Sequence, residues 1–160
     1  MLAMSAAACV LGIAAIVMTA INLTRPAPAP TTTTVTAQPP NYSPDQIAAA
    51  KREACDASVS VDQPLGGVHR ELTATLGNRV SPEHAGALST FSTVLMIEIE
   101  YMRNHTPPAT PADVQEATSH YIDSWIALGD AYTRELPNDQ LDKLRSEVVR
   151  WGDRLDEVCR

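Results

Sequence analysis

The sequence is poor in aromatic residues. Its 160 residues include one Phe, two Trp and four Tyr, although 44% of the chain is apolar. A folded core must therefore be built mainly from Ala and Leu. We expect such a core to depend on an additional covalent link, because small side chains bury little apolar surface each.

The sequence also lacks the short motifs that carry most catalytic and metal-binding chemistry. It has no Gly-x-Ser-x-Gly, phosphate loop, dinucleotide fingerprint, His-Glu-x-x-His or Cys-x-x-Cys pattern. Glu116 and His120, four residues apart, are a possible pair of metal ligands, but one pair does not make a site. Glu98 and Glu100 would point apart on a helix, unlike a glycosidase dyad. The four histidines lie in separate segments: His69, His84, His105 and His120. We therefore predict no catalytic, cofactor-binding or metal-binding residues, no cofactor and no enzyme activity.

Charge is absent from the first part of the chain. No charged side chain occurs in "LAMSAAACVLGIAAIVMTAINL", residues 2–23, and 22 helical residues span roughly 33 Å, about the hydrocarbon thickness of a bilayer. We predict a transmembrane anchor over residues 1–24. A cleaved signal peptide is the alternative, but it would begin with basic residues and have a shorter apolar run. Acylation at Cys9, after "AAA", is a further alternative.

The remainder of the chain is acidic. All 19 acidic residues and 11 of the 12 basic residues lie in residues 41–160, which leaves a formal charge of −8. A domain with this charge should avoid nucleic acid and should not lie flat on anionic lipid.

Residues 25–42 are rich in proline and threonine, as in "PAPAPTTTTVTAQPP". This composition predicts a disordered linker that acts as a semi-rigid spacer of up to roughly 55 Å. Both a bare linker and an O-glycosylated one fit the composition.

Four helix starts follow the linker. Ser43 is predicted to cap a helix whose first residue is Pro44, with Gln46 completing a capping box. Related starts are "SPEH" at 81–84, "TPAD" at 110–113 and "PNDQ" at 137–140, the last with Asn138 as the cap. Four starts predict four helices.

Apolar residues recur at spacings of three and four after each start, which is typical of a helical bundle. The four predicted rows are Ile47, Ala50, Ala54, Ala57, Val61, Leu65, Val68 and Leu72; Leu88, Phe91, Leu95, Ile99 and Met102; Val114, Ala117, Tyr121, Trp125, Leu128 and Tyr132; and Leu141, Leu144, Val148, Trp151, Leu155 and Val158. We interpret Trp125 and Trp151 as packing residues, with a ligand pocket as the alternative.

Pro64, Gly66 and Gly67 should kink or break the first helix. The short loops favour an all-α, antiparallel four-helix bundle over residues 43–160, with coiled-coil-like packing.

Two cysteines lie near the ends of this region. In an up-down-up-down bundle the first helix neighbours the fourth, so Cys55 and Cys159 are predicted to form a disulfide. It would close a loop worth up to roughly 4.7 kcal/mol in the chain-entropy model. Two free, buried cysteines are the alternative. Disulfides persist in oxidising compartments, which places the domain outside the cytoplasmic membrane, although Arg25 alone would favour the opposite orientation.

Three segments carry a resemblance to a known group of proteins: "YSPDQIAAAKREACDA", "ATPADVQEATSHYIDSWIALGDAY" and "DRLDEVCR". They resemble mycobacterial single-pass membrane proteins whose ectodomain opens with Tyr-[Ser/Thr]-x-x-Gln-[Ile/Val]-x-x-Ala-Lys and a Cys, carries an Ala-Thr-Pro start and ends in a Glu-Leu-Cys-Lys-like tail. The resemblance covers most of residues 41–160 and the character of the linker, and it implies an N-in orientation. It implies architecture and no chemistry. The segment "DQPLGGVHRE" departs from the pattern.

These observations favour a non-catalytic interaction or scaffolding module of the cell envelope. It would be a single-pass protein of the cytoplasmic membrane with its C-terminal domain outside, and its partner would be an envelope protein of unknown identity. The alternative is a bundle that opens near residues 64–67 to bind a lipid or another apolar small molecule.

Overall fold

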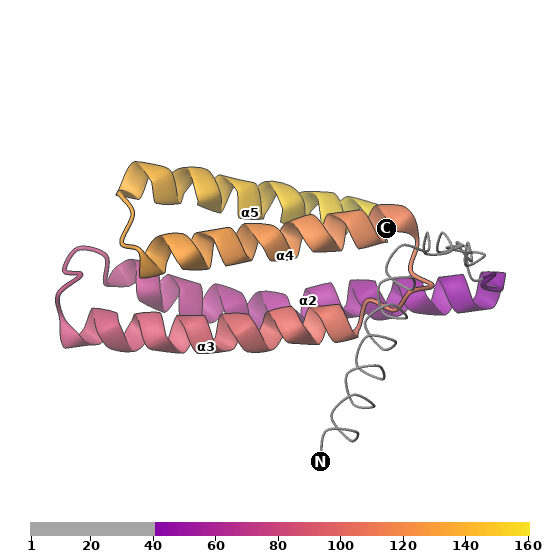
Figure 1. Cartoon of the computed structure of the whole chain (residues 1–160), viewed down its shortest axis with the longest axis horizontal. Coiled ribbons are helices and arrows are strands. Elements are labelled where there is room, and N and C mark those ends of the chain that lie inside the picture. Colours follow the sequence, from indigo (N-terminus) through magenta and orange to yellow (C-terminus); the bar gives the residue numbers. More distant parts are fainter. Residues whose placement is uncertain (1–40) are drawn as a thin grey trace, which may run out of the picture. The chain divides into compact units, whose positions relative to one another are not determined.

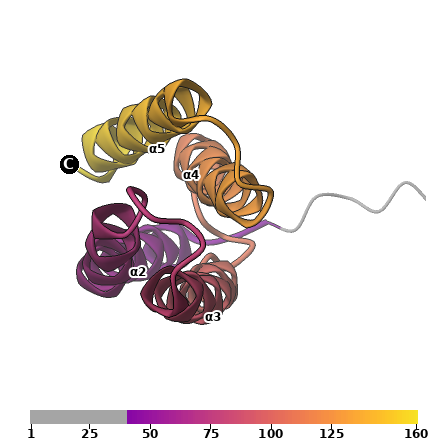
Figure 2. The same cartoon turned by 90° about the vertical axis from the view of Figure 1, so that its left-hand side faces the viewer.

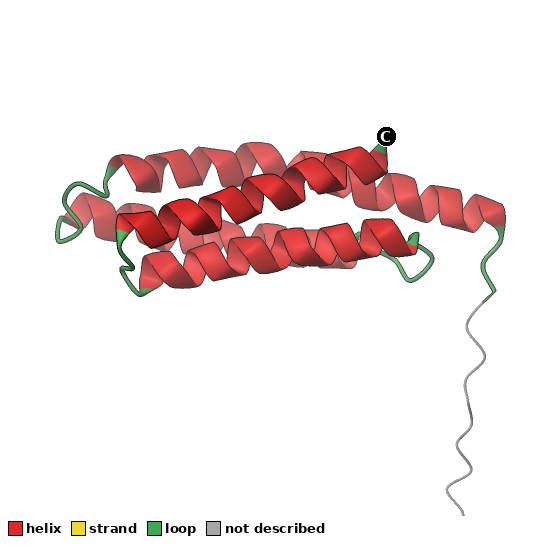
Figure 3. Cartoon of the chain, turned by 90° about the horizontal axis from the view of Figure 1, so that it is seen from above, coloured by secondary structure: helices red, strands yellow, loops and turns green. Residues whose placement is uncertain are grey.

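The computed structural model describes residues 41–160, which are all-helical and contain no strand (Figures 1 and 3). The helices are α2 (Pro44–Ala74), α3 (Pro82–Asn104), α4 (Ala112–Thr133) and α5 (Asn138–Cys159). None of these helices is both long and apolar enough to span a membrane. The predicted anchor, and the predicted linker up to residue 40, lie outside the described residues.

Consecutive helices run antiparallel and form two hairpins (Figure 1). The end view in Figure 2 shows α2 paired with α3, and α4 paired with α5. Packing is closer within each pair than between the pairs. The prediction of an antiparallel four-helix bundle is thus confirmed for this part of the chain.

Two of the predicted helix starts are confirmed in detail. The Ser43 hydroxyl accepts a hydrogen bond from the Gln46 backbone N–H at 3.3 Å, and the Gln46 side chain accepts one from the Ser43 N–H at 2.8 Å. Ser81 likewise accepts a hydrogen bond from the His84 N–H, at 3.1 Å. Each cap satisfies N–H groups that have no partner within the helix.

The other two predicted caps are wrong, because their side chains form hydrogen bonds with groups on other helices or loops. Thr110 is buried beside α2, where its hydroxyl donates a 3.5 Å hydrogen bond to the Ala50 carbonyl. Asn138 is the first residue of α5, and its side-chain oxygen accepts a 2.6 Å hydrogen bond from Arg79. Neither α4 nor α5 has a side-chain cap.

The apolar rows form one shared core. The row of α4 is buried at every predicted position, and the rows of α3 and α5 pack against the core throughout, with Leu88, Leu144, Trp151 and Val158 only partly buried. Ile47 is the exception in α2, because its side chain is 39% exposed. Figure 1 shows that the first turns of α2, which include Ile47, extend past the ends of the other helices.

Of the predicted kink or break in the first helix, the break is wrong. Helix α2 continues through Pro64 for 31 residues. A proline inside a helix costs about 3 kcal/mol, whereas burying one Val or Leu side chain contributes roughly 1.5–3 kcal/mol. The side chains of Val61, Leu65 and Leu72 are at most 1% exposed on both sides of the proline, and their burial offsets its cost. The alternative of a lipid site that opens near residues 64–67 stays a prediction.

Candidate functional site

The predicted disulfide is present and joins the two walls of a surface groove. Cys55 of α2 is bonded to Cys159 at the end of α5, with their Cα atoms 5.6 Å apart. The bridge links the two helical hairpins, because α2 belongs to one and α5 to the other.

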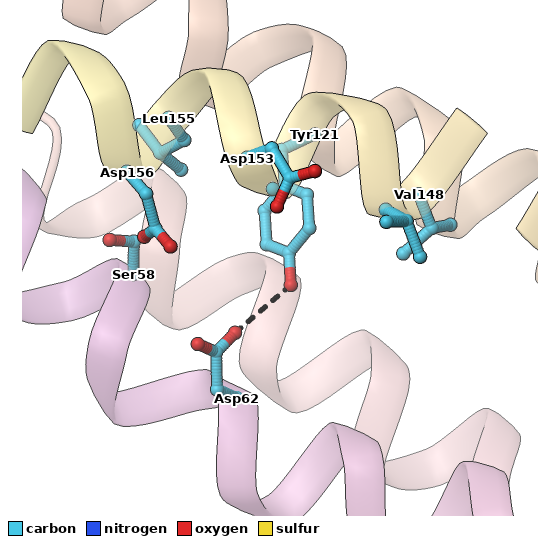
Figure 4. A pocket seen from close by; sticks show the side chains of 9 residues that line it. Ser58, Asp62, Tyr121, Val148, Asp153, Leu155 and Asp156 are labelled. Atoms are coloured by element: carbon cyan, nitrogen blue, oxygen red, sulfur yellow. Dashed lines mark hydrogen bonds between the residues drawn. The ribbon is translucent and has the colours of Figure 1, made fainter. Parts of the chain in front are cut away.

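The groove follows from helical spacing on either side of the bridge. Ser58 and Asp62 lie one and two turns after Cys55, and Asp156 lies one turn before Cys159. Residues three or four apart share one face of a helix, so these side chains face the neighbouring helix. They border a hollow of about 270 Å³ (Figure 4). Its lining residues are Ser58, Asp62, Tyr121, Val148, Val149, Gly152, Asp153, Leu155 and Asp156.

Tyr121 of α4 reaches into this groove and points toward Asp62 (Figure 4). A Cβ atom at Gly152 would lie 3.4 Å from the Tyr121 ring, so the missing side chain of Gly152 lets the ring pass close to α5. The Tyr121 hydroxyl donates a 3.0 Å hydrogen bond to Asp62 Oδ1 (Figure 4). Burial raises the pKa of Tyr121, which keeps the phenol protonated and able to donate.

The groove concentrates negative charge. It is lined by the carboxyl groups of Asp62, Asp153 and Asp156 and by no basic residue. None of the three forms an ion pair within residues 41–160. The pKa of Asp62 is raised by burial, is lowered in part by the Tyr121 hydrogen bond, and is raised further by the charge of Asp156. The site therefore holds carboxylates with no counter-charge at its lining.

Both hydroxyl groups of the groove already donate a hydrogen bond within the protein. Ser58 donates a 2.8 Å hydrogen bond to the Cys55 carbonyl, and Tyr121 donates to Asp62. What remains for a ligand is carboxylate oxygens and hydroxyl lone pairs, all of which are acceptors. Val149, which is 61% exposed, adds apolar surface beside them. This arrangement suits a ligand that carries a positive charge, several N–H donors and an aliphatic stem, as Arg and Lys side chains do.

The pair of possible metal ligands lies elsewhere, on the outer surface of α4. Glu116 Oε1 and His120 Nε2 are 4.0 Å apart, and both side chains are largely exposed. The His120 ring stacks on Trp151 with ring centroids 4.1 Å apart. No group of three or more possible ligand residues occurs in the part of the chain that the structure describes.

The two tryptophans have different surroundings. Trp125 is buried in the core, as predicted, with its side chain 6% exposed. Trp151 is only partly buried and lies between His120 and the guanidinium of Arg150, which is 4.9 Å from the ring centroid. Trp151 therefore packs at the edge of the core rather than within it.

A second polar cluster connects three helices inside the bundle. Arg145 Nε of α5 donates to the Tyr132 hydroxyl of α4 at 3.0 Å, and that hydroxyl lies 2.8 Å from His69 Nε2 of α2. Burial, followed by the charges of Arg145 and Arg70, lowers the pKa of His69 to about 4. The hydrogen bond between the Tyr132 hydroxyl and His69 Nε2 therefore extends the contact of Arg145 with Tyr132 to a third helix.

The groove residues Asp62, Tyr121, Asp153 and Asp156 were not predicted as a site from the sequence. A signal was present, since the predicted Cys55–Cys159 bridge already placed α2 beside α5. Counting one and two turns away from each cysteine leads to Asp62 and Asp156. The contribution of Tyr121 could not be found in this way, because it enters from a third helix.

No family model, curated protein or solved structure matches this chain. The resemblance to mycobacterial single-pass membrane proteins therefore stays a prediction. Function must be inferred from the geometry and the charge of the groove.

Proposed function

We propose that this chain is a non-catalytic interaction module of the cell envelope, whose helical domain binds a basic segment of another envelope protein. The single observation that carries the proposal is the groove between α2 and α5, which offers three carboxyl groups and only hydrogen-bond acceptors. Its hollow of about 270 Å³ has room for a long side chain rather than for a large cofactor.

The placement in the envelope is supported by two features. The uncharged run at residues 2–23 is long enough for a membrane anchor. The Cys55–Cys159 disulfide is typical of proteins in oxidising compartments. An anchor followed by the Pro/Thr-rich segment would hold the acidic domain away from the membrane, where it could meet a partner.

Charge complementarity defines the partner. A segment with one or more Arg or Lys side chains would place a guanidinium or ammonium group between Asp62 and Asp156, with its aliphatic stem near Val149. The overall charge of −8 on residues 41–160 would also attract such a segment from a distance. Binding of this kind is expected to weaken with added salt.

The proposal is tested with the purified full chain in detergent and a short fluorescent peptide of arginine and alanine. The double variant Asp62→Asn/Asp156→Asn should bind this peptide about tenfold more weakly than the unaltered chain. Fluorescence anisotropy measures the dissociation constants, and circular dichroism checks that the helices remain.

The matched control is Glu71→Gln/Glu135→Gln, which removes the same number of charges at exposed positions outside the groove. Its affinity should change by less than about twofold. Equal loss of binding in both double variants would show that only the overall charge matters, and the groove would then not be the binding site.

A further inference from the structure

A second hollow lies where α3 ends and α4 begins. Its volume of about 320 Å³ is at the lower end of the range for small-molecule sites. Residues of α3, of the connecting loop and of α4 line this hollow, which we call the loop pocket; among them are Arg103, Thr106, Pro108, Gln115, Thr118 and Asp123. The loop pocket shares no lining residue with the acidic groove between α2 and α5.

Hydrogen bonds hold the loop that forms one wall of the pocket. The Thr110 N–H donates to the Pro107 carbonyl at 2.9 Å, which closes a tight turn. Gln115 of α4 donates from Nε2 to the carbonyls of Thr110 at 2.7 Å and Pro108 at 3.3 Å. This wall is therefore in place before a ligand arrives, which lowers the entropic cost of binding.

The loop pocket contains a positive and a negative side chain that do not pair with each other. Arg103 belongs to α3 and Asp123 to α4, and neither forms an ion pair within residues 41–160. Glu100, one turn before Arg103, does not line the pocket and accepts a hydrogen bond from Asn104 at 3.1 Å. A ligand in the pocket thus meets one unpaired charge of each sign.

Thr118 adds a buried hydroxyl group that has no partner. The residue is 3% exposed, and its Oγ1 atom forms no hydrogen bond in the part of the chain that the structure describes. Other helical threonines of this domain donate to the carbonyl four residues earlier; they are Thr90, Thr93 and Thr133. Buried polar groups without a partner are rare in folded proteins. An oxygen atom of a ligand in the pocket would give the Thr118 hydroxyl an acceptor.

The two unpaired charges select the class of ligand. A simple anion would be attracted by Arg103 but repelled by Asp123 and by the overall charge of −8. A simple cation would be repelled by Arg103, and it would find three carboxyl groups without a basic residue in the acidic groove. A molecule that carries both charges pairs with both side chains.

We propose that the loop pocket binds a small zwitterion of amino-acid or dipeptide size. The carboxylate of the ligand pairs with Arg103, and its ammonium group pairs with Asp123. The Thr118 hydroxyl donates a hydrogen bond to an oxygen of the ligand. The planar guanidinium of Arg103 can hold the carboxylate through two parallel hydrogen bonds, which sets the orientation of the ligand.

Isothermal titration of the purified full chain in detergent tests the proposal, with alanine and alanyl-alanine as probes. At least one of them should bind with a dissociation constant of about 1 mM or below. The N-acetyl derivative of that probe lacks the ammonium group, and its amide derivative lacks the carboxylate. Each derivative should bind about fivefold more weakly than the probe, as expected for the loss of one exposed ion pair.

Variants assign each charge of the ligand to its side chain. Arg103→Gln should bind the probe about fivefold more weakly and should no longer prefer it to the amide derivative. Asp123→Asn should likewise lose the preference over the N-acetyl derivative. A purely structural role would weaken all three ligands alike. The matched control is Arg52→Gln/Asp56→Asn, at exposed positions of α2 outside the pocket, which should keep the affinity and both preferences.

Thr118→Val removes the hydroxyl but keeps the shape of the side chain, and it should also weaken binding about fivefold. Circular dichroism checks that the helices remain in every variant. The proposal is overturned if neither probe binds at about ten times the expected dissociation constant, if the blocked derivatives bind as well as the probe, or if Thr118→Val keeps full affinity. Equal effects of the pocket variants and the control would overturn it as well. Asp62→Asn/Asp156→Asn should leave the affinity for the zwitterion unchanged, so this proposal and that for the acidic groove stand or fall separately.

Discussion

At the scale of single residues, the partly buried His69 ring couples the packing of three helices to pH. Its folded-state pKa of about 4 lies below the ordinary value of 6.5, because burial and the charges of Arg145 and Arg70 oppose its protonation. The unfolded chain therefore takes up a proton more readily than the folded one. The stabilising effect of neutral His69 is thus complete above about pH 6.5 and is lost as the pH falls towards about 4.

We expect the free energy of unfolding to fall by about 1–3 kcal/mol over this pH range in the unaltered chain, after allowance for partial exposure of the ring. His69→Gln should lower the stability at neutral pH and flatten the dependence on pH. His120→Gln, which alters an exposed ring, is the control and should keep the dependence. Urea unfolding at a series of pH values measures the effect, and an unchanged pH profile in His69→Gln would contradict the assignment.

Residue-scale prediction from the sequence succeeded where the relevant partners are local. Ser43 and Gln46 cap each other across three residues, so the pattern itself contains both partners. Asn138 failed as a cap because its partner, Arg79, is 59 residues away in sequence. The Asp62–Tyr121 hydrogen bond spans the same separation and was missed for the same reason.

At the scale of helices, two glycines inside helices have opposite surroundings: Gly129 is closely packed and Gly67 is not. Gly129→Ala would place a Cβ atom 2.6 Å from Leu95 Cδ2, the end of a buried side chain that would have to shift. We expect a loss of about 1–2 kcal/mol from overpacking. Gly67→Ala is the matched change in α2, where no atom lies within 4 Å of the new Cβ. There we expect a gain of about 0.5–1 kcal/mol, because Ala loses less backbone entropy than Gly.

Thermal unfolding of the two full-chain variants, followed by circular dichroism, should move their midpoints in opposite directions. A rise of both midpoints would mean that helix propensity, rather than the contact between α3 and α4, governs both positions. Sequence reasoning could place Gly129 on a helix, but it could not identify Leu95 as its neighbour.

Helix-scale prediction worked where one apolar row is long and regular. The row of α4, from Val114 to Tyr132, is buried at every position. The row of α2 is equally continuous from Ala50 to Leu72, yet Pro64 led to the expectation of a kink or break. Local propensity was overridden there by burial, whose contribution depends on the partner helices and is not visible in the segment itself.

At the scale of the whole molecule, the sequence predicted four antiparallel helices but not their pairing into two hairpins. The Cys55–Cys159 bridge connects α2 with α5 across those hairpins, where packing between helices is less close than within each pair. It thus closes a long loop, with the cysteines 104 residues apart, and it also holds the walls of the acidic groove. Both roles require that the protein stay in an oxidising compartment.

Thiol labelling of intact cells tests on which side of the membrane the domain lies. With the domain outside the cytoplasmic membrane, a membrane-impermeant thiol reagent should label Cys55 and Cys159 in intact cells only after an impermeant reductant has opened the bridge. Mass spectrometry of the two cysteine peptides scores the labelling, and a cytoplasmic thiol protein of the same cells should remain unlabelled until lysis. Labelling of both cysteines only after lysis, with no need for reduction, would place the domain in the cytoplasm with free thiols. The proposed envelope partner would then be excluded, because the groove and its carboxylates would face the wrong side of the membrane.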